Sequence, residues 1–460
     1  MNTSPDWSPD SWRRKLLRQG IDYPDESALA EALAQLSRLP PLVTSWEVEK
    51  LKGLLAQAAR GEAFLLQGGD CSEQFADCRS EAIVAQLKIL LSMSMVLAFG
   101  AQRRIVRVGR FAGQYTKPRS SATETRAGRT LPAYRGDLVN GPEFTAAART
   151  PDPARLLRGY ERAALTLNFI RGLVDGGFAD MHHPEYWDLG FVKFAELSGE
   201  YMQIVGKIAD GLRLLETLAG RPLDELQRMD FYAGHEGLHL AYEQMQTRQV
   251  PRRSGWYDLT CHMPWIGNRT NQLDGAHVEF FRGIANPIGV KIGPETAPAD
   301  LVTLARVLNP ANEPGRLTII HRFGAQEIAR ALPPLIAALR HAGQTVLWCC
   351  DPMHGNTQNT RTGRKTRDFQ AIRAELDQAF ELHRAHGSLL GGVHFELTGE
   401  NVTECCGGAR GLAEADLEHA YLSHVDPRLN YEQSLELALL LAHKMALGSQ
   451  GSAEQQKGRP

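Results

Sequence analysis

The 460-residue chain has no excess of charge of either sign. Its 51 lysine and arginine residues are balanced by 53 aspartate and glutamate residues, which gives a formal net charge of -2. Proteins that bind polyanions through their overall field carry a clear positive excess. We therefore expect no nucleic-acid partner, and an anionic ligand must be held by a local group of basic side chains.

Cysteine is scarce and irregularly spaced. The number is odd, and four of the cysteines form two adjacent pairs, which rarely bind one ion. No spacing resembles a small secreted disulfide framework or a zinc ribbon, so we expect a reduced, cytoplasmic protein. The seven are Cys71, Cys78, Cys261, Cys349, Cys350, Cys405 and Cys406.

A secretion signal and a membrane span are also missing. The residues after Met1 include no basic segment followed by an apolar one, as a signal peptide requires. No segment is long and apolar enough to span a bilayer. The stretch from Ile89 to Phe99 is short and carries Ser92 and Ser94. We expect no membrane partner, and we expect this stretch to form a core helix.

The sequence does contain a regular alternation of short β-rich runs and helical stretches. Eight parallel strands, each followed by a helix, would close a (β/α)8 TIM barrel of the α/β class. The alternative is a doubly wound open sheet, but no dinucleotide-binding glycine motif follows an early strand. The predicted strands are 63–69, 105–110, 230–235, 261–267, 288–293, 317–322, 345–351 and 392–397, and the helical stretches include 80–99, 326–342 and 366–386.

The chain divides into four predicted parts. Residues 1–60 form an N-terminal helical extension, with a helix start at Ser8-Pro9-Asp10. The catalytic barrel spans 61–447. About 120 residues separate the second and third strands, far more than one crossover needs, so we expect a helical insertion at about 151–220. The polar segment 448–460 is predicted to be a flexible tail.

Strong metal-ligand residues occur at several predicted strand ends. Cys71 follows the first strand, His354 follows the seventh, and Glu396 ends the eighth, while Asp426 lies in a later loop. Together they offer one sulfur, one nitrogen and two carboxylates, a mixed set suited to a divalent transition metal. In a barrel the carboxyl ends of all strands meet at one mouth.

Basic residues also occur at or after the carboxyl ends of predicted strands. Such a group would repel itself without anionic ligands, so it predicts a pocket for phosphates or carboxylates next to the metal. Its members are Arg110, Lys117, Arg269, Lys291 and Arg322, and Glu236 and Asn268 lie at the third and fourth strand ends.

Each residue alone has an ordinary structural alternative. Cys71 would be an inert buried thiol, His354 a loop histidine bonded to backbone, Asp426 before Pro427 a turn residue, and each arginine half of an ion pair. Glu396 follows His394 by two residues, and we expect one of them to face the lumen and the other the helices. These ordinary roles explain the residues less well when all are considered together, because most of the candidate residues fall at predicted strand ends.

Several long motifs resemble those of type II (plant-like) 3-deoxy-D-arabino-heptulosonate 7-phosphate (DAHP) synthase. The resemblance extends from about Trp7 to about Leu440. The motifs are LQGGDC (66–71), GQYTKPRS (113–120), YRGD (134–137), QLDGAHVEF (272–280), DPMHGNT (351–357) and TGENVTEC (398–405).

The resemblance implies a (β/α)8 barrel that condenses phosphoenolpyruvate with erythrose 4-phosphate and water, the first step of the shikimate pathway to aromatic amino acids. It implies a divalent ion, Mn²⁺ or Co²⁺, on the four ligands above. Phosphoenolpyruvate would contact Arg110, Asn268, Arg269, Lys291 and Arg322, and Lys117 would serve erythrose 4-phosphate. We expect Lys291 to handle protons, with a pKa lowered by neighbouring cations, and Glu236 to orient water or the aldehyde.

The chain departs from the family pattern at three places. Asn268 replaces the usual glutamate, Val425 replaces a frequent cysteine, and His321 to Gly324 differs from the common form. Two alternatives therefore stay open: a secondary-metabolism relative (an aminoDAHP synthase or a phenazine-pathway DAHP synthase) and a non-catalytic regulatory barrel.

The resemblance also bears on partners. It makes a homodimer or homotetramer and a chorismate mutase partner plausible, and the insertion around Trp187 a candidate site for an aromatic amino acid effector. No plastid transit segment is apparent, which favours a bacterial enzyme.

Overall fold

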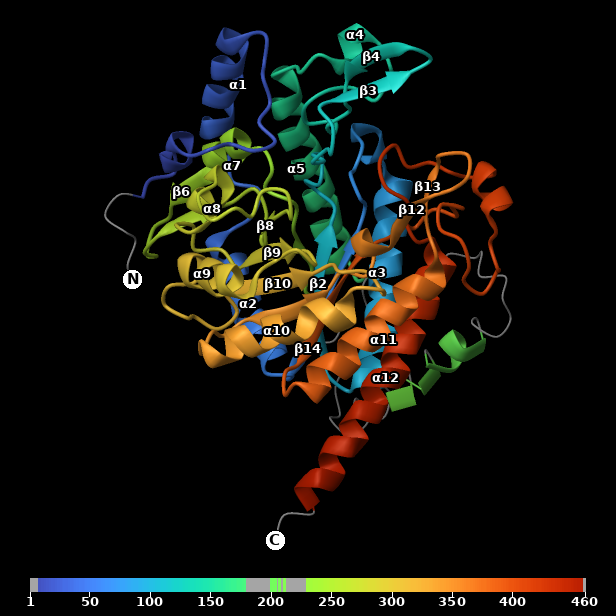
Figure 1. Cartoon of the computed structure of the whole chain (residues 1–460). Helices are drawn as coiled ribbons and strands as arrows, with labels where there is room; N and C mark the ends of the chain where they lie inside the picture. Colours follow the sequence, from blue (N-terminus) through green and yellow to red (C-terminus); the bar gives the residue numbers. More distant parts are fainter. Residues whose placement is uncertain (1–6, 179–198, 205, 208–209, 212–228, 458–460) are drawn as a thin grey trace.

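The computed structural model describes residues 7–178, 199–204, 206–207, 210–211 and 229–457. Within them, eight strands form one parallel sheet (Figure 1). Every predicted strand is found within a few residues of its expected position. The strands are β1 (Ala63–Gly69), β2 (Arg104–Arg110), β5 (Tyr232–Ala233), β8 (Trp265–Ile266), β9 (Ile288–Ile292), β10 (Leu317–His321), β11 (Leu347–Cys350) and β14 (Leu390–Glu396).

The sheet closes on itself. Each strand pairs in parallel with the next along the chain, and β14 returns to pair with β1. A parallel bridge between Glu236 and Trp265 joins β5 to β8. There the Trp265 N–H donates to the His235 carbonyl and the Gly237 N–H to the Trp265 carbonyl, both at 3.0 Å. The predicted (β/α)8 barrel is therefore confirmed.

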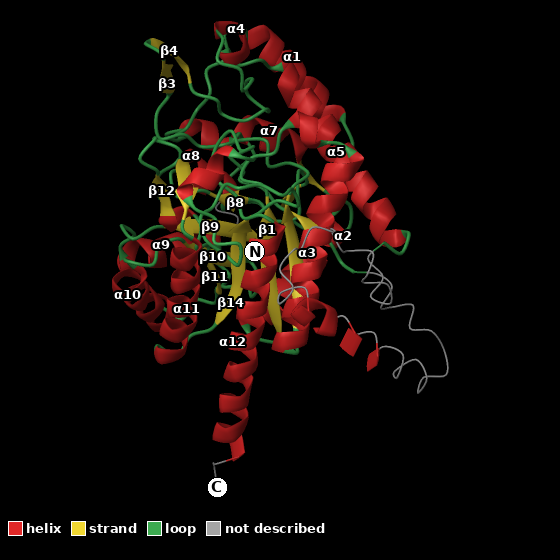
Figure 2. Cartoon of the chain, turned by 90° about the vertical axis from the view of Figure 1, so that its right-hand side faces the viewer, coloured by secondary structure: helices red, strands yellow, loops and turns green. Residues whose placement is uncertain are grey.

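Helices surround the strands, as Figure 2 shows in red around yellow. The sheet side chains alternate between the lumen and this helical layer. Ile320 and Cys349 pack with Trp265 inside the barrel, whereas Ile319 and Cys350 belong to the cluster shared with the helices. The helices of this layer include α3 (Ser80–Ala101), α9 (Pro298–Leu308), α10 (Ile328–His341), α11 (Phe369–Ala385) and α12 (Tyr431–Lys457).

Several short elements connect the barrel strands. They include the hairpins β3 (Thr123–Arg126) with β4 (Arg129–Pro132), β6 (Thr247–Gln249) with β7 (Trp256–Asp258), and β12 (Thr357–Asn359) with β13 (Lys365–Arg367). The short helices are α4 (Ala146–Arg149), α7 (Leu240–Gln246) and α8 (Ala276–Phe281), with 3-10 turns η2 (Phe75–Asp77), η5 (His354–Asn356) and η6 (Glu414–Glu418).

The membrane expectation needs a correction at α3. By length and composition this helix could cross a membrane, so our expectation that no segment reaches that length is wrong. The helix begins at Ser80, well before the apolar stretch at Ile89. Most of it is buried, and it packs against β1, β2 and α12. A core helix of a globular protein has this burial, and the predicted core helix is confirmed.

The N-terminal region begins with a 3-10 turn, η1 (Ser11–Arg14), where the sequence suggested a longer helix, followed by α1 (Glu26–Arg38) and α2 (Ser45–Ala59). After the second strand, α5 (Ala154–Asp175) forms the first part of the predicted insertion. Trp187 and much of the rest of the predicted insertion, about 151–220, lie outside the described residues. The last helix, α12, continues to Lys457, through most of the segment predicted to be a tail.

Helix α2 closes the amino-terminal end of the barrel. A capping box starts it: the Thr44 hydroxyl accepts from the Glu47 N–H at 3.3 Å, and Glu47 accepts from the Thr44 N–H at 2.8 Å. Leu51, Leu54 and Leu55 then pack with lumen residues of the barrel strands. The N-terminal region therefore supplies part of the barrel core.

Leu55→Ala should destabilise the protein without changing its site. Leu55 is fully buried in the lumen cluster, so we expect a loss of about 2–5 kcal/mol in the free energy of unfolding. Gly53→Ala on the same helix meets no atom within 4 Å and should stabilise by about 0.5–1 kcal/mol. Urea unfolding measures both. A loss below about 1 kcal/mol for Leu55→Ala would contradict the role of α2 as a plug.

Candidate active site

Strand alternation places the candidate residues at the carboxyl-terminal mouth. Arg110, Lys291 and Glu396 occupy the inward-facing register of β2, β9 and β14, and Cys71 extends that of β1. The turn after β1 depends on Gly69, which has φ of +146° and where a Cβ would lie 2.9 Å from the Arg110 carbonyl oxygen. Glycine therefore lets β1 and β2 approach closely just before the thiol.

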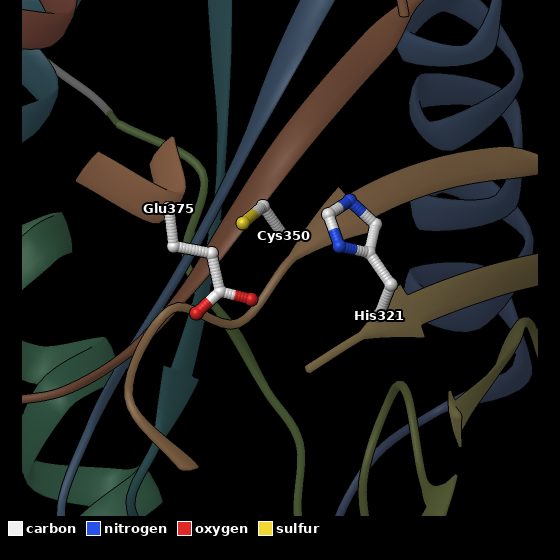
Figure 3. Close-up of side chains that lie close together, drawn as sticks. All are labelled: His321, Cys350 and Glu375. Atoms are coloured by element: carbon white, nitrogen blue, oxygen red, sulfur yellow. The ribbon is translucent and has the colours of Figure 1, made fainter. Parts of the chain in front are cut away.

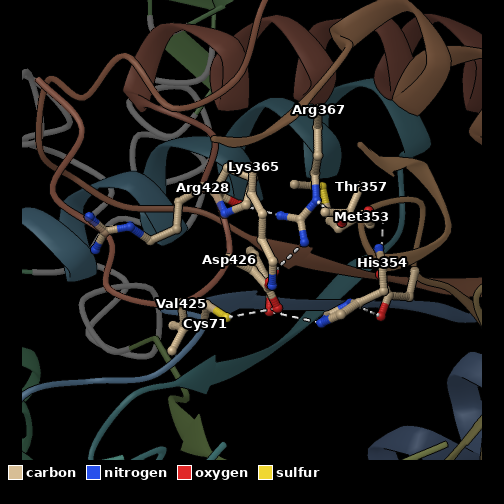
Figure 4. Close-up of polar contacts among 12 residues, drawn as sticks. Cys71, Met353, His354, Thr357, Lys365, Arg367, Val425, Asp426 and Arg428 are labelled. Atoms are coloured by element: carbon tan, nitrogen blue, oxygen red, sulfur yellow. Dashed lines mark hydrogen bonds and ion pairs between the residues drawn. The ribbon is translucent and has the colours of Figure 1, made fainter. Parts of the chain in front are cut away.

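Three of the four candidate metal ligands form a compact cluster. One donor atom each of Cys71, Glu396 and Asp426 lies within 4.8 Å of the others, and all three residues are buried. His354 adjoins them, with Nε2 3.0 Å from Glu396 Oε1. Figure 4 shows Cys71, His354 and Asp426 converging from separate segments. The structure therefore brings the four predicted residues together.

Asp351 orients His354 from behind. Its Oδ2 lies 2.7 Å from His354 Nδ1 and 2.8 Å from Lys291 Nζ, while Oδ1 accepts the N–H groups of Met353 and His354. With Nδ1 engaged in this way, Nε2 is directed at the cluster. Histidine ligands in metalloproteins show this carboxylate support. Burial opposes the charge of Asp351, but His354 and Lys291 hold its pKa well below the ordinary value.

Cations surround Glu396. Arg110 Nη2 lies 3.1 Å from Oε1, and Arg367 Nη2 lies 2.7 Å from Oε2. Burial alone would raise the pKa of this carboxyl, but His354, Lys117 and Arg367 together hold it well below its ordinary value. Glu396 is therefore an anion in the folded chain.

Asp426 lies in the loop before α12. Lys365 Nζ lies 2.6 Å from its Oδ1 and Lys117 Nζ 2.7 Å from its Oδ2. Burial opposes ionisation here too, but the attraction of Lys117, Lys365 and Arg367 keeps the pKa of Asp426 well below the ordinary value.

Cys71, unlike the two carboxyl groups, is favoured in its neutral form. Burial, with the neighbouring Glu396 and Asp426 charges, raises the pKa of the thiol to about 12, although Lys117 opposes this. The Lys117 ammonium lies 2.6 Å from Sγ. A positive charge is thus already stabilised among three candidate ligands, and a divalent ion would favour the thiolate more strongly.

All the predicted anion-binding residues except Arg110 line one cavity of about 360 Å³, which the candidate metal ligands His354 and Asp426 also line. Arg322 is held by a 2.8 Å bond to the His354 carbonyl, and Arg269 bonds Ser120 at 2.8 Å. Arg110 is almost fully buried, and its guanidinium donates to His394 and Glu396. The cavity is lined by Lys117, Pro118, Arg119, Ser120, Ser121, Thr123, Glu236, Gly267, Asn268, Arg269, Lys291, Arg322, His354, Thr357, Lys365 and Asp426.

Two lining residues have shifted pKa values suited to proton transfer. Burial lowers the pKa of Lys291, and Arg110 lowers it further, while Asp351 opposes the shift. The predicted direction is confirmed, but burial, not neighbouring cations, is the larger cause. Burial also raises the pKa of Glu236, against the pull of Lys291 and Lys117. Its Oε1 is buried without a hydrogen-bond partner in the described structure.

Asn268 retains a carboxylate neighbour. Its Nδ2 donates to Glu295 Oε1 at 2.8 Å, and its own Oδ1 is buried without a partner in the described part of the chain. Asn268 therefore keeps a carboxylate beside it, although Glu295 is not among the residues that line the cavity.

Sequence reasoning missed three supporting residues. Arg367 fell within the predicted helical stretch 366–386 and Lys365 immediately before it, but α11 begins at Phe369 and both residues belong to β13. His394 was expected to face away from Glu396, and that expectation is wrong because residues two apart share a face of a strand. Its Nε2 accepts from Arg110 Nη1 at 2.6 Å inside the lumen. The two-residue alternation of side chains along a strand, applied correctly, predicts His394 on the lumen face with Glu396.

Comparison with known proteins gives a consistent result. The model of the class-II DAHP synthetase family matches residues 7–442. The chain is 47% identical over 455 residues to the phospho-2-dehydro-3-deoxyheptonate aldolase of Neurospora crassa, covering 95% of this chain and 94% of that protein.

Two further relatives and one solved structure extend this comparison. The phospho-2-dehydro-3-deoxyheptonate aldolase of Streptomyces coelicolor is 46% identical over 440 residues (96% and 97% coverage), and that of Mycolicibacterium smegmatis is 44% identical over 437 residues (94% and 93%). The solved structure of the Francisella tularensis aldolase aligns with a TM-score of 0.44 at 15% identity, covering 94% of this chain and 98% of that one.

Arg367→Met should destabilise the fold in a pH-dependent way. Removing one partner of a buried ion pair costs about 3–5 kcal/mol, and Arg367 and Glu396 are both fully buried. The folded pKa of Glu396 is depressed, so its pairing stabilises the fold above the ordinary glutamate pKa of about 4.3 and is lost as pH falls through the folded value. The variant raises that folded pKa.

The difference in unfolding free energy should therefore be largest near neutral pH and shrink toward acid. Denaturant titrations between neutral and acid pH measure it. Arg373→Met, which breaks a half-exposed pair with Asp377, is the control and should cost less than about 1 kcal/mol. A pH-independent loss would show that Arg367 acts through packing alone.

Proposed function

We propose that this chain, which belongs to the class-II DAHP synthetase family, performs its reaction with a divalent metal ion bound by Cys71, His354, Glu396 and Asp426. The chain is a DAHP synthase: it condenses phosphoenolpyruvate with erythrose 4-phosphate and water and releases phosphate. The family is generally metal-dependent. The observation that carries the proposal is the convergence of these donors beside a cavity lined with basic residues.

The donor set fits a borderline divalent ion such as Mn²⁺ or Co²⁺. One thiol, one imidazole and two carboxylates combine soft and hard ligands. The ionised state of Glu396 and Asp426 and the Asp351 support for His354 favour binding. When bound, the ion supplies a Lewis acid for the aldehyde oxygen of erythrose 4-phosphate.

Basic residues in the cavity wall, together with Arg110 close to Glu396, hold phosphoenolpyruvate. Arg110, Arg269 and Arg322 suit its phosphate and carboxylate because a guanidinium can bond two oxygens at once. Asn268 offers an amide to the same ligand. Lys117 begins the Lys-Pro-Arg-Ser segment of the cavity wall, and its ammonium contacts the proposed metal ligands Cys71 and Asp426. This position supports its assignment to erythrose 4-phosphate.

Proton transfers fall to Lys291 and Glu236. Carbon 3 of phosphoenolpyruvate attacks the aldehyde carbon, so the aldehyde oxygen must gain a proton, and water must lose one as it adds to carbon 2. Lys291 has a lowered pKa and therefore donates a proton readily. Glu236 has a raised pKa and an unpartnered Oε1, which suits it to accept the proton of water.

The cellular location, oligomeric state and partners of the protein are proposed from its composition and from the family resemblance. Seven free cysteines support a cytoplasmic enzyme, and the resemblance supports a homodimer or homotetramer. A chorismate mutase partner and an aromatic amino acid effector rest on the same resemblance, since Trp187 lies outside the described residues.

The direct test is phosphate release from phosphoenolpyruvate plus erythrose 4-phosphate with Mn²⁺. We expect activity in the wild type that a chelator abolishes, and a loss of at least about 100-fold in Cys71→Ala and His354→Ala, because each removes a ligand of the Lewis acid. Cys78→Ala and the exposed His419→Ala are matched controls and should stay active.

Two outcomes would contradict these assignments. Full activity after chelation, or in both ligand variants, would remove the metal proposal. Activity with iminoerythrose 4-phosphate but none with erythrose 4-phosphate would favour the aminoDAHP alternative that Asn268 raises, and Asn268→Glu would be the next variant.

Asp351→Asn should weaken metal binding without removing a ligand. Loss of a carboxylate behind a ligating histidine typically costs 10–100-fold in metal affinity or activity. The same change removes the anion that keeps the pKa of Lys291 from falling further, so the pH profile of kcat should shift toward acid. Competition with a chelating dye measures affinity. Unchanged affinity and profile would show that Asp351 only stabilises the strand end.

A further inference from the structure

A second cluster of metal-ligand residues lies outside the lumen. His321 and Cys350 end β10 and β11, where they are register partners, and Glu375 comes from α11. One ligand atom of each lies within 4.8 Å of the others, and all three residues are buried. Figure 3 shows the His321 ring, the Cys350 sulfur and the Glu375 carboxylate gathered around one space.

The cluster is separate from the proposed catalytic ligands. Ile320 and Cys349 pack inside the barrel with Trp265. Their neighbours His321 and Cys350 therefore face the helical layer on the other side of the sheet. None of the three residues lines the substrate cavity.

The imidazole of His321 is the strongest sign of a missing partner. The side chain is fully buried, yet neither ring nitrogen has a hydrogen-bond partner in the described structure. Phe323 stacks on the ring with centroids 5.4 Å apart and an interplanar angle of 17°. A buried polar group left unpaired is destabilising, and such groups call for a bound water or ion.

Hydrogen bonds hold the Glu375 carboxylate in place but leave it able to accept a further bond. Its Oε1 accepts the N–H groups of Phe323 and Gly324, both at 2.9 Å, and its Oε2 accepts from Asn356 at 2.7 Å. A carboxylate offers about four lone-pair sites, so Oε2 can still bind an ion. Cys350 is a free thiol, and a metal would convert it to the thiolate with release of its proton.

We propose that His321, Cys350 and Glu375 bind a second divalent metal ion of the Zn²⁺ or Co²⁺ type. Imidazole, thiolate and carboxylate are ligands of such ions, which favour tetrahedral coordination, with water in the fourth position. The ion would join β10, β11 and α11 directly behind the active site, because His321 precedes Arg322 and Cys350 precedes Asp351. Its role is structural, and it does not depend on the metal proposal for the lumen.

Co²⁺ is the probe, because a thiolate ligand gives it a near-ultraviolet charge-transfer band. The chain is produced in cobalt-supplemented medium, since the site is buried. The background is Cys71→Ala, which removes the thiolate of the lumen cluster. We expect a thiolate–cobalt band in this protein. It should vanish with Cys350→Ser and weaken or shift with Glu375→Gln and His321→Asn.

Cys349→Ser is the matched control, because this buried thiol neighbours Cys350 but faces the lumen; the band should persist. Absence of the band in the Cys71→Ala protein, or its survival after Cys350→Ser, would overturn the proposal and leave a buried water beside His321.

Should Cys350→Ser fold poorly, a second measurement decides. Cobalt-loaded Cys71→Ala protein should melt at a higher temperature than the metal-depleted form, and His321→Asn should reduce that difference. Equal melting temperatures with and without cobalt would overturn the proposal too.

Discussion

The site depends on one electrostatic constraint: a carboxylate buried at the barrel mouth must be surrounded by cations. Glu396 is fully buried, and removing its charge from water would cost several kcal/mol without compensation. Arg110, Arg367 and His354 contact its two oxygens. The same requirement pairs Asp351 with Lys291 and Asp426 with Lys117 and Lys365. These pairs fix the donor atoms in place before any ligand arrives.

The closed barrel makes this constraint achievable. Alternation along parallel strands sends every second side chain into the lumen, so apolar residues fill the lower layers and charged residues the last one. Helix α2 seals the opposite end with leucines. Water is thereby kept from one end of the lumen. Solvent and ligands can reach the charged layer only through the open mouth. The position of the N-terminal region is therefore part of how the site is built.

Sequence reasoning recovered what depends on strand ends and lost what depends on contacts between distant loops. Cys71, Arg110, Lys291 and Glu396 were found because a barrel collects the residues that end its strands. Asp426 was proposed from its residue type and from the family resemblance, since no strand pattern leads to a loop before α12. Arg367 was missed because three residues of β13 resemble the start of the helix that follows. Only the fold shows that Arg367 reaches Glu396 and the Pro427 carbonyl.

Charge balance also explains why the site suits two phosphorylated substrates. Around the mouth, lysines and arginines outnumber the carboxylates that pair with them, and the thiol of Cys71 is neutral because burial raises its pKa. The proposed divalent ion would add further positive charge. Phosphoenolpyruvate and erythrose 4-phosphate bring the compensating negative charge, so each substrate lowers the electrostatic cost of holding the other components. The positive charge of the cavity beside the candidate metal ligands therefore matches the negative charge of the two substrates.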